Sequence, residues 1–279
     1  MFQPDLLKGK RILITGGGTG LGLSMGRRFL ELGADLVICG RREAVLQEAA
    51  AKLTAETKSA VETHGCDIRD AAAVDGMMET IWNKRPLDAL VNNAAGNFIS
   101  RSEALSHRGV DAVLNIVLHG AAYCTLSAGR RWLAAKQKGM VLSIITTYAW
   151  TGSAYVVPSA MAKAGVLAMT RSLAAEWGGR GVRLNAIAPG PFPTPGAWER
   201  LVPRPDLAHE FETRNPLGRV GDHRELADLA SFLVSDGSGY INGEVVTIDG
   251  GEWLMGAGQF NFLRQLTEAD WQALKPKKS

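Results

Sequence analysis

The fold is decided by the stretch Arg11-Ile12-Leu13-Ile14-Thr15-Gly16-Gly17-Gly18-Thr19-Gly20-Leu21-Gly22. Its first half is a short apolar, β-branched run, which predicts a buried strand. Its second half fits the spacing Gly-x-x-x-Gly-x-Gly through Gly16, Gly20 and Gly22. Because glycine permits a tight turn and lets backbone N–H groups approach a pyrophosphate, this strand-to-helix junction predicts a dinucleotide-binding site. An ordinary turn is the alternative, since a lone glycine-rich motif is weak.

Strands and helices alternate along the rest of the chain. The expected strands are 11–15, 35–39, 59–66, 87–92, 140–146, 183–188 and 245–248. The expected helices are 21–32, 43–53, 71–82, 109–135, 159–177 and 225–233. This alternation predicts an α/β fold with a doubly wound parallel sheet, the Rossmann fold. No repeat or linker interrupts it, so we expect one domain over residues 1–279, with 252–279 as a C-terminal extension.

One connection between these elements is unusually long. The segment 191–215 is rich in proline and shows no clear periodicity. A connection of this length in a compact domain is typical of a substrate lid.

Composition excludes several functional classes. The net charge is +3, and a dense basic run occurs only in the tail Lys275-Pro276-Lys277-Lys278, which we interpret as a solvated terminus rather than a nucleic-acid site. Cys39, Cys66 and Cys124 lack metal-ligand spacing and predict small buried side chains in a reducing compartment. The histidines are equally scattered, so we expect no metal site.

The ends of the chain carry no address that we can identify. The N-terminus has no basic start followed by an apolar core, and no apolar stretch is long enough to predict a membrane span. The final Lys-Lys-Ser differs from the peroxisomal signal Ser-Lys-Leu. We therefore expect a cytoplasmic protein.

The end of the second strand indicates which nicotinamide cofactor is used. It reads Cys39-Gly40-Arg41-Arg42, without the acidic residue that would bind the ribose diol of NAD. Two guanidinium groups at this point favour the 2′-phosphate of NADPH, and either arginine could bind it. Two solvated arginines at a helix start are the alternative.

Five ordered motifs resemble the short-chain dehydrogenase/reductase family over nearly the whole chain. They are the glycine-rich turn, Cys66-Asp67-Ile68, Asn92-Asn93-Ala94-Ala95-Gly96, the helix carrying Lys163, and Asn185-Ala186-Ile187-Ala188-Pro189-Gly190. The resemblance implies Asp67 and Ile68 at the adenine, Asn93 to Gly96 beside the adenosine, Lys163 on the nicotinamide ribose, and Pro189 with Thr194 at the carboxamide. The expected cofactor-binding residues are Gly16, Thr19, Gly20, Leu21, Gly22, Arg41, Arg42, Asp67, Ile68, Asn93, Ala94, Ala95, Gly96, Lys163, Pro189, Gly190 and Thr194.

The proton-transfer residues depart from that family's pattern. A Tyr-x-x-x-Lys pair on one helix normally moves the proton, and this chain offers Ser159 and Lys163. Thr146 occupies the family's serine position, and Val117 the place of its helical asparagine. A serine hydroxyl is a far weaker acid than a tyrosine hydroxyl. Either the protein is inactive, or its acid lies elsewhere, or its reaction does not need that acid.

A narrower resemblance accounts for these departures. The stretches 93–100, 148–153 and 157–165 are similar to the mitochondrial-type 2,4-dienoyl-CoA reductases, as are Pro189-Gly190-Pro191, Thr194 and Gly256 with Phe260-Asn261. That group places its tyrosine on the loop after strand five, which here is Tyr148, and pairs it with Asn97. Trp150 departs from the acidic residue expected there, and Tyr155 is a rival proton donor.

This resemblance implies NADPH-dependent reduction of 2,4-dienoyl-CoA to 3-enoyl-CoA in unsaturated fatty acid β-oxidation. Tyr148 and Asn97 would donate hydrogen bonds to the thioester oxygen of a dienolate. Lys163 would hold the cofactor ribose, and Ser159 would bond the nicotinamide or orient Lys163. The expected catalytic residues are therefore Tyr148, Asn97, Lys163 and Ser159.

Several points stay open. Another carbonyl or alcohol could be the substrate, with Tyr148 replacing the missing tyrosine, or the chain could bind NADP without catalysis. The apolar residues of the extension, such as Trp253 and Phe260, could pack on this or a neighbouring subunit or line an acyl chain. The family resemblance also implies a homotetramer, with a fatty acyl-CoA as the substrate.

Overall fold

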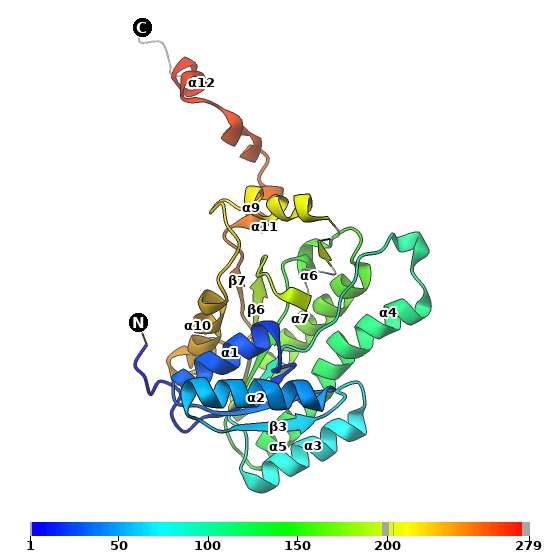
Figure 1. The fold of residues 1–279 in the computed structure, drawn as a ribbon, viewed down its shortest axis with the longest axis vertical. Helices are drawn as coiled ribbons and strands as arrows, with labels where there is room; N and C mark the ends of the chain where they lie inside the picture. Colours follow the sequence, from blue (N-terminus) through cyan, green and yellow to red (C-terminus); the bar gives the residue numbers. More distant parts are fainter. Residues whose placement is uncertain (1, 197–200, 203, 275–279) are drawn as a thin grey trace.

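Parallel strands form a sheet in the order β3-β2-β1-β4-β5-β6-β7, which is a doubly wound arrangement (Figure 1). The computed structural model describes residues 2–196, 201–202 and 204–274. The strands are β1 (Arg11–Thr15), β2 (Asp35–Gly40), β3 (Val61–Gly65), β4 (Ala89–Asn92), β5 (Gly139–Ile144), β6 (Val182–Pro189) and β7 (Val245–Ile248). All neighbouring pairs among them run parallel, so the predicted Rossmann fold is confirmed.

Helices follow most of the strands. They are α1 (Gly20–Glu31), α2 (Glu43–Thr57), α3 (Ala71–Lys84), α4 (His107–Leu114), α5 (Gly120–Ala134), α6 (Tyr148–Thr151), α7 (Val157–Trp177), α9 (Glu210–Thr213), α10 (His223–Val234), α11 (Glu252–Ala257) and α12 (Glu268–Ala273). Short 3-10 turns lie at Ser102–Ala104, Gly178–Arg180, Pro205–His209, Asp236–Ser238 and Asn261–Gln265.

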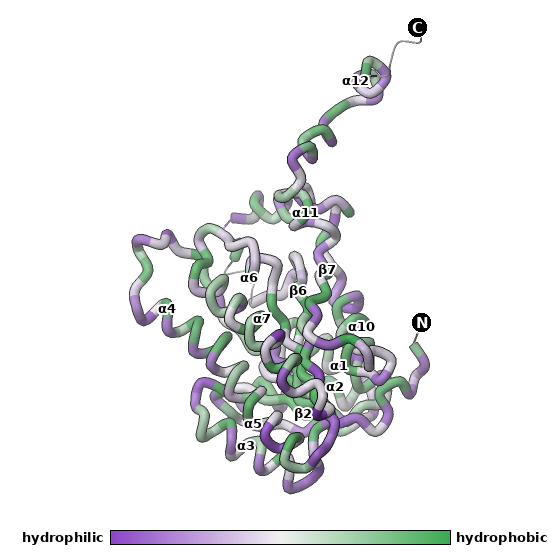
Figure 2. The backbone as a smooth tube through the Cα atoms, turned by 180° about the vertical axis from the view of Figure 1, so that it is seen from behind, coloured by the Kyte–Doolittle hydropathy of each residue, from purple (hydrophilic) through white to green (hydrophobic). Residues whose placement is uncertain are grey.

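Both faces of the sheet are covered, which explains why most positions of the central strands are apolar on either face. Along β1, Ile12 and Ile14 pack with α1, α2 and α10, whereas Leu13 packs on the opposite face with α3, α5 and α7. In Figure 2 the tube is green mainly at the centre of the molecule, where strands and inner helix faces meet. The three cysteines lie in the second of these cores, unpaired and buried, as predicted.

The long helix predicted over 109–135 is one continuous helical stretch with an irregular middle. A π-type segment, Asn115–His119, joins α4 to α5. A π-type turn contains one residue more than an α-helical turn, and the apolar pattern of the sequence does not reveal this extra residue. By length and composition alone His107–Ala134 could cross a membrane, but half of its most apolar window is buried. Cys124, Ala128 and Trp132 of α5 belong to the core, which accounts for this composition.

One further expectation changes, and two other segments contain short helices that the sequence did not predict. Tyr148, expected on a loop, is the first residue of the one-turn helix α6. The lid segment 191–215 contains Pro205–His209 and α9, and its residues 197–200 and 203 lie outside the described residues. The extension folds into α11, Asn261–Gln265 and α12 and leads away from the sheet (Figure 1). The lysines of the tail also lie outside the described residues.

Candidate active site

The glycine-rich turn after β1 disfavours a side chain at Gly16, Gly20 and Gly22. Gly16 and Gly20 have φ values of +67° and +54°, in the left-handed region. A Cβ atom on Gly22 would lie 2.5 Å from the carbonyl oxygen of Gly16 and 2.6 Å from Nδ2 of Asn93. The start of α1 therefore sits directly on the turn, which is the geometry of a pyrophosphate cradle.

Two side chains clamp this turn to β4. Asn93 Nδ2 donates to the carbonyl oxygens of Thr15 (3.0 Å) and Gly16 (3.3 Å). Thr15 Oγ1 accepts hydrogen bonds from the backbone N–H groups of Asn93 and Ala94, both at 3.0 Å. The side chain of Asn93 thus holds the turn in shape. The sequence did not point to Thr15, whose partners lie far along the chain.

The N-terminus of α1 is free to bind an anion. Its N-cap residue Thr19 makes no capping hydrogen bond, and its first turn carries no acidic side chain. Exposed N–H groups and the helix dipole at such an end favour a phosphate. Thr194 lies against the same turn, because a Cβ atom on Gly20 would be 3.3 Å from its methyl group. The structure therefore brings the turn and Thr194 together.

His223 anchors the loop that carries Thr194. Its Nε2 donates to the carbonyl oxygen of Pro193 (2.7 Å), and its Nδ1 is hydrogen-bonded to Ser24 Oγ of α1 (2.8 Å). The ring thereby fixes the loop after β6 to α1. Sequence reasoning missed this role, since nothing near His223 marks it.

The residues at the ends of β2 and β3 form the edge of the same site. Arg41 and Arg42 are exposed, and neither has an ion pair within the part of the chain that the structure describes. The hydrogen bond from Arg69 lowers the pKa of Asp67, and the charge of Arg41 adds a smaller effect. Ile68 is buried against Gly120. The arginines keep their donors available for an anion.

Asn97, Tyr148 and Ser159 form a continuous chain of hydrogen-bonding groups. The Tyr148 hydroxyl lies 3.1 Å from Ser159 Oγ and 3.5 Å from Asn97 Nδ2. The Asn97 amide is oriented by its own backbone, because its Oδ1 accepts from the N–H of Phe98 at 2.9 Å. Its NH₂ group consequently faces the tyrosine. Ser159 is 2% exposed, so its hydroxyl is available to groups inside the site rather than to solvent.

Lys163 lies one helical turn beyond Ser159 and is buried. Its Nζ donates to the carbonyl oxygen of Ile144, at the end of β5. Burial lowers the pKa of this amine from 10.5 to about 8. Ser159 Oγ is hydrogen-bonded to Tyr148 rather than to Lys163, and its expected contact with the nicotinamide stays a prediction.

The other proton-transfer candidates are placed elsewhere. Tyr155 is 58% exposed, and its backbone rather than its hydroxyl is used, accepting a hydrogen bond from Ser100 N. Thr146 Oγ1 accepts from the N–H of Tyr148 (3.4 Å), so it orients the start of α6. Val117 is buried beside Ala162. Of the two tyrosines considered, only Tyr148 belongs to the chain of donors.

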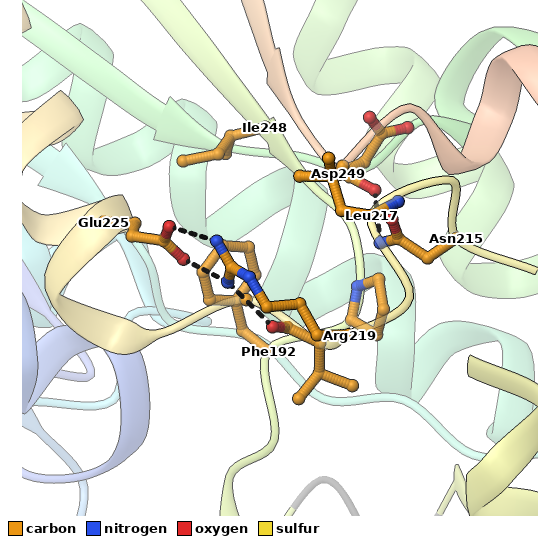
Figure 3. Close-up of a pocket in the computed structure, with 11 residues that line it drawn as sticks. Phe192, Asn215, Leu217, Arg219, Glu225, Ile248 and Asp249 are labelled. Atoms are coloured by element: carbon orange, nitrogen blue, oxygen red, sulfur yellow. Dashed lines mark hydrogen bonds and ion pairs between the residues drawn. The ribbon is translucent and has the colours of Figure 1, made fainter. Parts of the chain in front are cut away.

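A separate hollow lies beside the loop after β6, and its chemistry is different (Figure 3). Arg219 is held there by Glu225 at 2.6 Å, and Asn215 donates to the carbonyl oxygen of Asp249. These polar groups are paired with one another. None of Asn97, Tyr148 and Ser159 lines the hollow. Within the described ranges no group of His, Cys, Asp and Glu side chains could hold a metal ion.

Comparison with known proteins gives concordant matches. A family model described as enoyl-(acyl carrier protein) reductase matches residues 16–252. The chain is 44% identical over 247 residues to a Bacillus subtilis protein named probable 2,4-dienoyl-CoA reductase, (2E)-enoyl-CoA-producing, covering 88% of this chain and 97% of that one. It is 40% identical over 278 residues to Caenorhabditis elegans probable 2,4-dienoyl-CoA reductase 3, (3E)-enoyl-CoA-producing (97% and 90%). A solved short chain dehydrogenase from Bacillus anthracis is 41% identical, with a TM-score of 0.78 over 88% of this chain and 96% of that one.

Proposed function

The chain belongs to the short-chain dehydrogenase/reductase family, and from this premise we propose that it reduces 2,4-dienoyl-CoA thioesters to 3-enoyl-CoA with NADPH. Family membership makes it an oxidoreductase that uses a nicotinamide cofactor. One observation carries the finer proposal. Asn97, Tyr148 and Ser159 form one hydrogen-bonded chain at the end of β5, although α7 lacks the usual tyrosine.

The described residues fit the phosphates of NADPH. The crowded glycine turn and the uncapped N-terminus of α1 would hold the pyrophosphate. Arg41 and Arg42, which have no ion-pair partner among the described residues, would bind the 2′-phosphate, and Lys163 would hold the nicotinamide ribose. When bound there, the cofactor supplies a hydride.

The hydroxyl chain supports transfer to a conjugated thioester. A hydride added at the δ-carbon moves both double bonds and places negative charge on the thioester oxygen. The Tyr148 hydroxyl and the Asn97 amide would each donate a hydrogen bond to that oxygen, and one such donor contributes about 3–4 kcal/mol in comparable sites. Ser159 can donate to the tyrosine oxygen, which leaves the hydrogen of Tyr148 free for the substrate.

The position of protonation decides the product. One proton added at the α-carbon of the dienolate leaves the 3-enoyl thioester, whereas protonation at the γ-carbon leaves the 2-enoyl thioester. The two relatives carry names of the two kinds. We propose α-protonation, from Tyr148 or from water, because the hydroxyl lies at the oxygen end of the substrate. Analysis of the enoyl-CoA product by chromatography and mass spectrometry distinguishes the two.

The test of the function is the oxidation of NADPH with a defined set of substrates. We expect turnover of a 2,4-dienoyl-CoA and little or none of a simple 2-enoyl-CoA or an unconjugated ketone. Rapid ketone turnover without diene turnover contradicts the proposal and favours the alternative carbonyl reductase. Tight NADPH binding without any turnover favours an inactive binding protein.

We also propose that the protein acts as a homotetramer in the β-oxidation of unsaturated fatty acids. A single chain contains all the candidate catalytic residues, so the site itself does not require a second subunit. The proposal of four subunits therefore rests on family resemblance. Light scattering coupled to gel filtration measures the mass directly, and a monomeric mass at enzyme concentrations used in the assay contradicts this part.

A further inference from the structure

Helix α6, which carries Tyr148, is too short to hold its own position. It has four residues, Tyr148–Thr151, and isolated helices of this length do not persist in water. Its N-cap residue Thr147 makes no side-chain capping bond, and the helix ends at Gly152, whose φ is +72°. The placement of the tyrosine hydroxyl must therefore come from what packs against α6.

The inner side of α6 is attached to α7. Ala149 is buried in a cluster with Val166 and Leu167, and the Tyr148 hydroxyl reaches Ser159. These contacts engage only the inner side of the helix. Trp150 lies on the outer side, at the position where the resemblance suggested an acidic residue.

The indole of Trp150 meets an indole from the C-terminal segment. The ring centroids of Trp150 and Trp253 are 6.0 Å apart and the planes are inclined at 87°, an edge-to-face contact. Aromatic pairs favour this arrangement and gain from it beyond the area that they bury. The two residues are more than a hundred positions apart in the sequence and join α6 to α11.

Trp253 is itself fixed to the sheet. The Asp249 carboxylate, 7% exposed at the end of β7, accepts from the N–H groups of Gly251 (2.8 Å) and Trp253 (3.0 Å). The carbonyl oxygen of the same residue accepts from Asn215 Nδ2 at 2.9 Å. The start of α11 is thus held by hydrogen bonds to the Asp249 carboxylate rather than by its own length.

The indole pair spans the site. In the sheet order β6 lies between β5, which leads into α6, and β7, which leads into α11. Pro189 ends β6 beside Ile248, and the N–H of Gly190 donates to the carbonyl oxygen of Ile248 at 2.9 Å. The two indoles therefore link the strands on either side of the expected nicotinamide position. Figure 1 shows α6 and α11 toward the same end of the sheet.

We propose that Trp253 is a positioning residue, which acts through Trp150 to hold α6 and so to keep the Tyr148 hydroxyl next to Asn97. The inference rests on the proposed function only for its catalytic consequence. The indole contact itself exists without substrate. A residue of the C-terminal segment thereby becomes part of the support of the active site.

The test compares single and double substitutions at the pair. We expect Trp253→Ala and Trp150→Ala each to lower kcat for a dienoyl-CoA by about threefold to tenfold, the range that an aromatic pair provides. The KM for NADPH stays unchanged. The double variant loses no more than either single variant, and Trp253→Phe restores most of the rate. Trp253→Leu keeps apolar bulk without a ring, and we expect it to behave like Trp253→Ala.

The matched control is Trp271→Ala, in the same segment. Trp271 is 46% exposed and has no ring contact among the described residues, so kcat should not change. An unchanged kcat in Trp253→Ala, full activity in Trp253→Leu, or multiplicative losses in the double variant each overturn the proposal.

A second measurement separates this inference from the proposed function. A double-mutant cycle on urea unfolding of the free protein measures the coupling between Trp150 and Trp253 without any substrate. If the wild-type protein does not reduce dienoyl-CoA, the proposed function is wrong. The positioning role is still supported if Trp150 and Trp253 are coupled in unfolding and their substitution lowers the reductase activity that the protein does have. Absence of coupling in the unfolding cycle contradicts it.

Discussion

The halves that we propose for cofactor and substrate at the carboxyl end of the sheet are built by different means. At the ends of β1 and β4, glycine backbones and the buried Thr15–Asn93 clamp leave no room for change. At the ends of β5 and β7, the short helix α6 is placed by side-chain contacts, among them Tyr148–Ser159 with α7 and Trp150–Trp253 with α11. The cofactor is shared across a family, whereas substrates differ. In this chain the glycine turn is fixed by backbone packing, whereas the Tyr148 hydroxyl is placed by contacts between side chains.

The largest expected effect belongs to the substrate half. Tyr148→Phe removes one donor to the thioester oxygen, and we expect kcat for dienoyl-CoA to fall by about 10²- to 10³-fold. The Kd for NADPH, measured by fluorescence, should stay within about twofold because the cofactor half is untouched. The matched change Tyr155→Phe, at an exposed residue, should leave kcat unaltered. If Tyr155→Phe were the damaging change, the acid would be wrongly assigned.

Lys163 links the two halves, and its effect is expected on stability. Because burial depresses its folded-state pKa to about 8 from 10.5, the unfolded chain binds more protons between these values. Stability of the free protein therefore rises with pH across this window, by up to about 3 kcal/mol from this group. Lys163→Met removes that rise. We would measure urea unfolding from pH 7 to 10.5.

The exposed Lys8→Met supplies the baseline for this experiment. Any advantage of Lys163→Met over the wild type should be greatest near pH 7 and shrink toward pH 10.5. A difference that does not change with pH shows that the buried amine is not the titrating group.

In the cofactor half, Gly22→Ala places a methyl group against Gly16 and Asn93. Overpacking of this kind costs about 2 kcal/mol, so we expect the Kd for NADPH to rise roughly thirtyfold. Gly76→Ala in α3 is the control, since a Cβ atom there meets nothing within 4 Å. It should leave binding unchanged and stabilise the helix. An equal Kd for NADPH in Gly22→Ala and Gly76→Ala would contradict the view that the glycine turn is more rigid than the rest of the site.

The smallest expected effect lies at the edge of the cofactor half. Arg41→Ala or Arg42→Ala should weaken NADPH binding about tenfold and leave NADH binding unchanged, because the guanidinium groups would contact only the 2′-phosphate. Arg180→Ala, an exposed arginine in another part of the fold, serves as the control. An unaltered ratio of NADPH to NADH affinity in both variants contradicts the choice of cofactor.

The sequence was most informative where structure is local. The limits of β1 and β7 agree with the structure to the residue, since each is a short apolar run with turn residues at its ends. Helix α6 escaped notice because four residues cannot show a period. The helices of the extension were not predicted either.

The same division holds in the site. Asn97 and Tyr148 come together as the resemblance implied, across 51 positions. The supporting roles of Thr15 and His223 were missed, since their partners lie 78 and 199 positions away and no motif connects them. Such pairings are set by the tertiary fold, and local patterns carry no trace of them.

The unpaired cysteines provide a way to measure how often the helix-covered face of the sheet opens transiently. Cys39 and Cys124 are fully buried, and burial raises the pKa of the Cys66 thiol to about 11, so the reactive thiolate is scarce in the closed molecule. A thiol reagent can label them only during transient openings of the face covered by α3 and α5. The rate at which each cysteine is labelled therefore reports how often that face of the sheet opens.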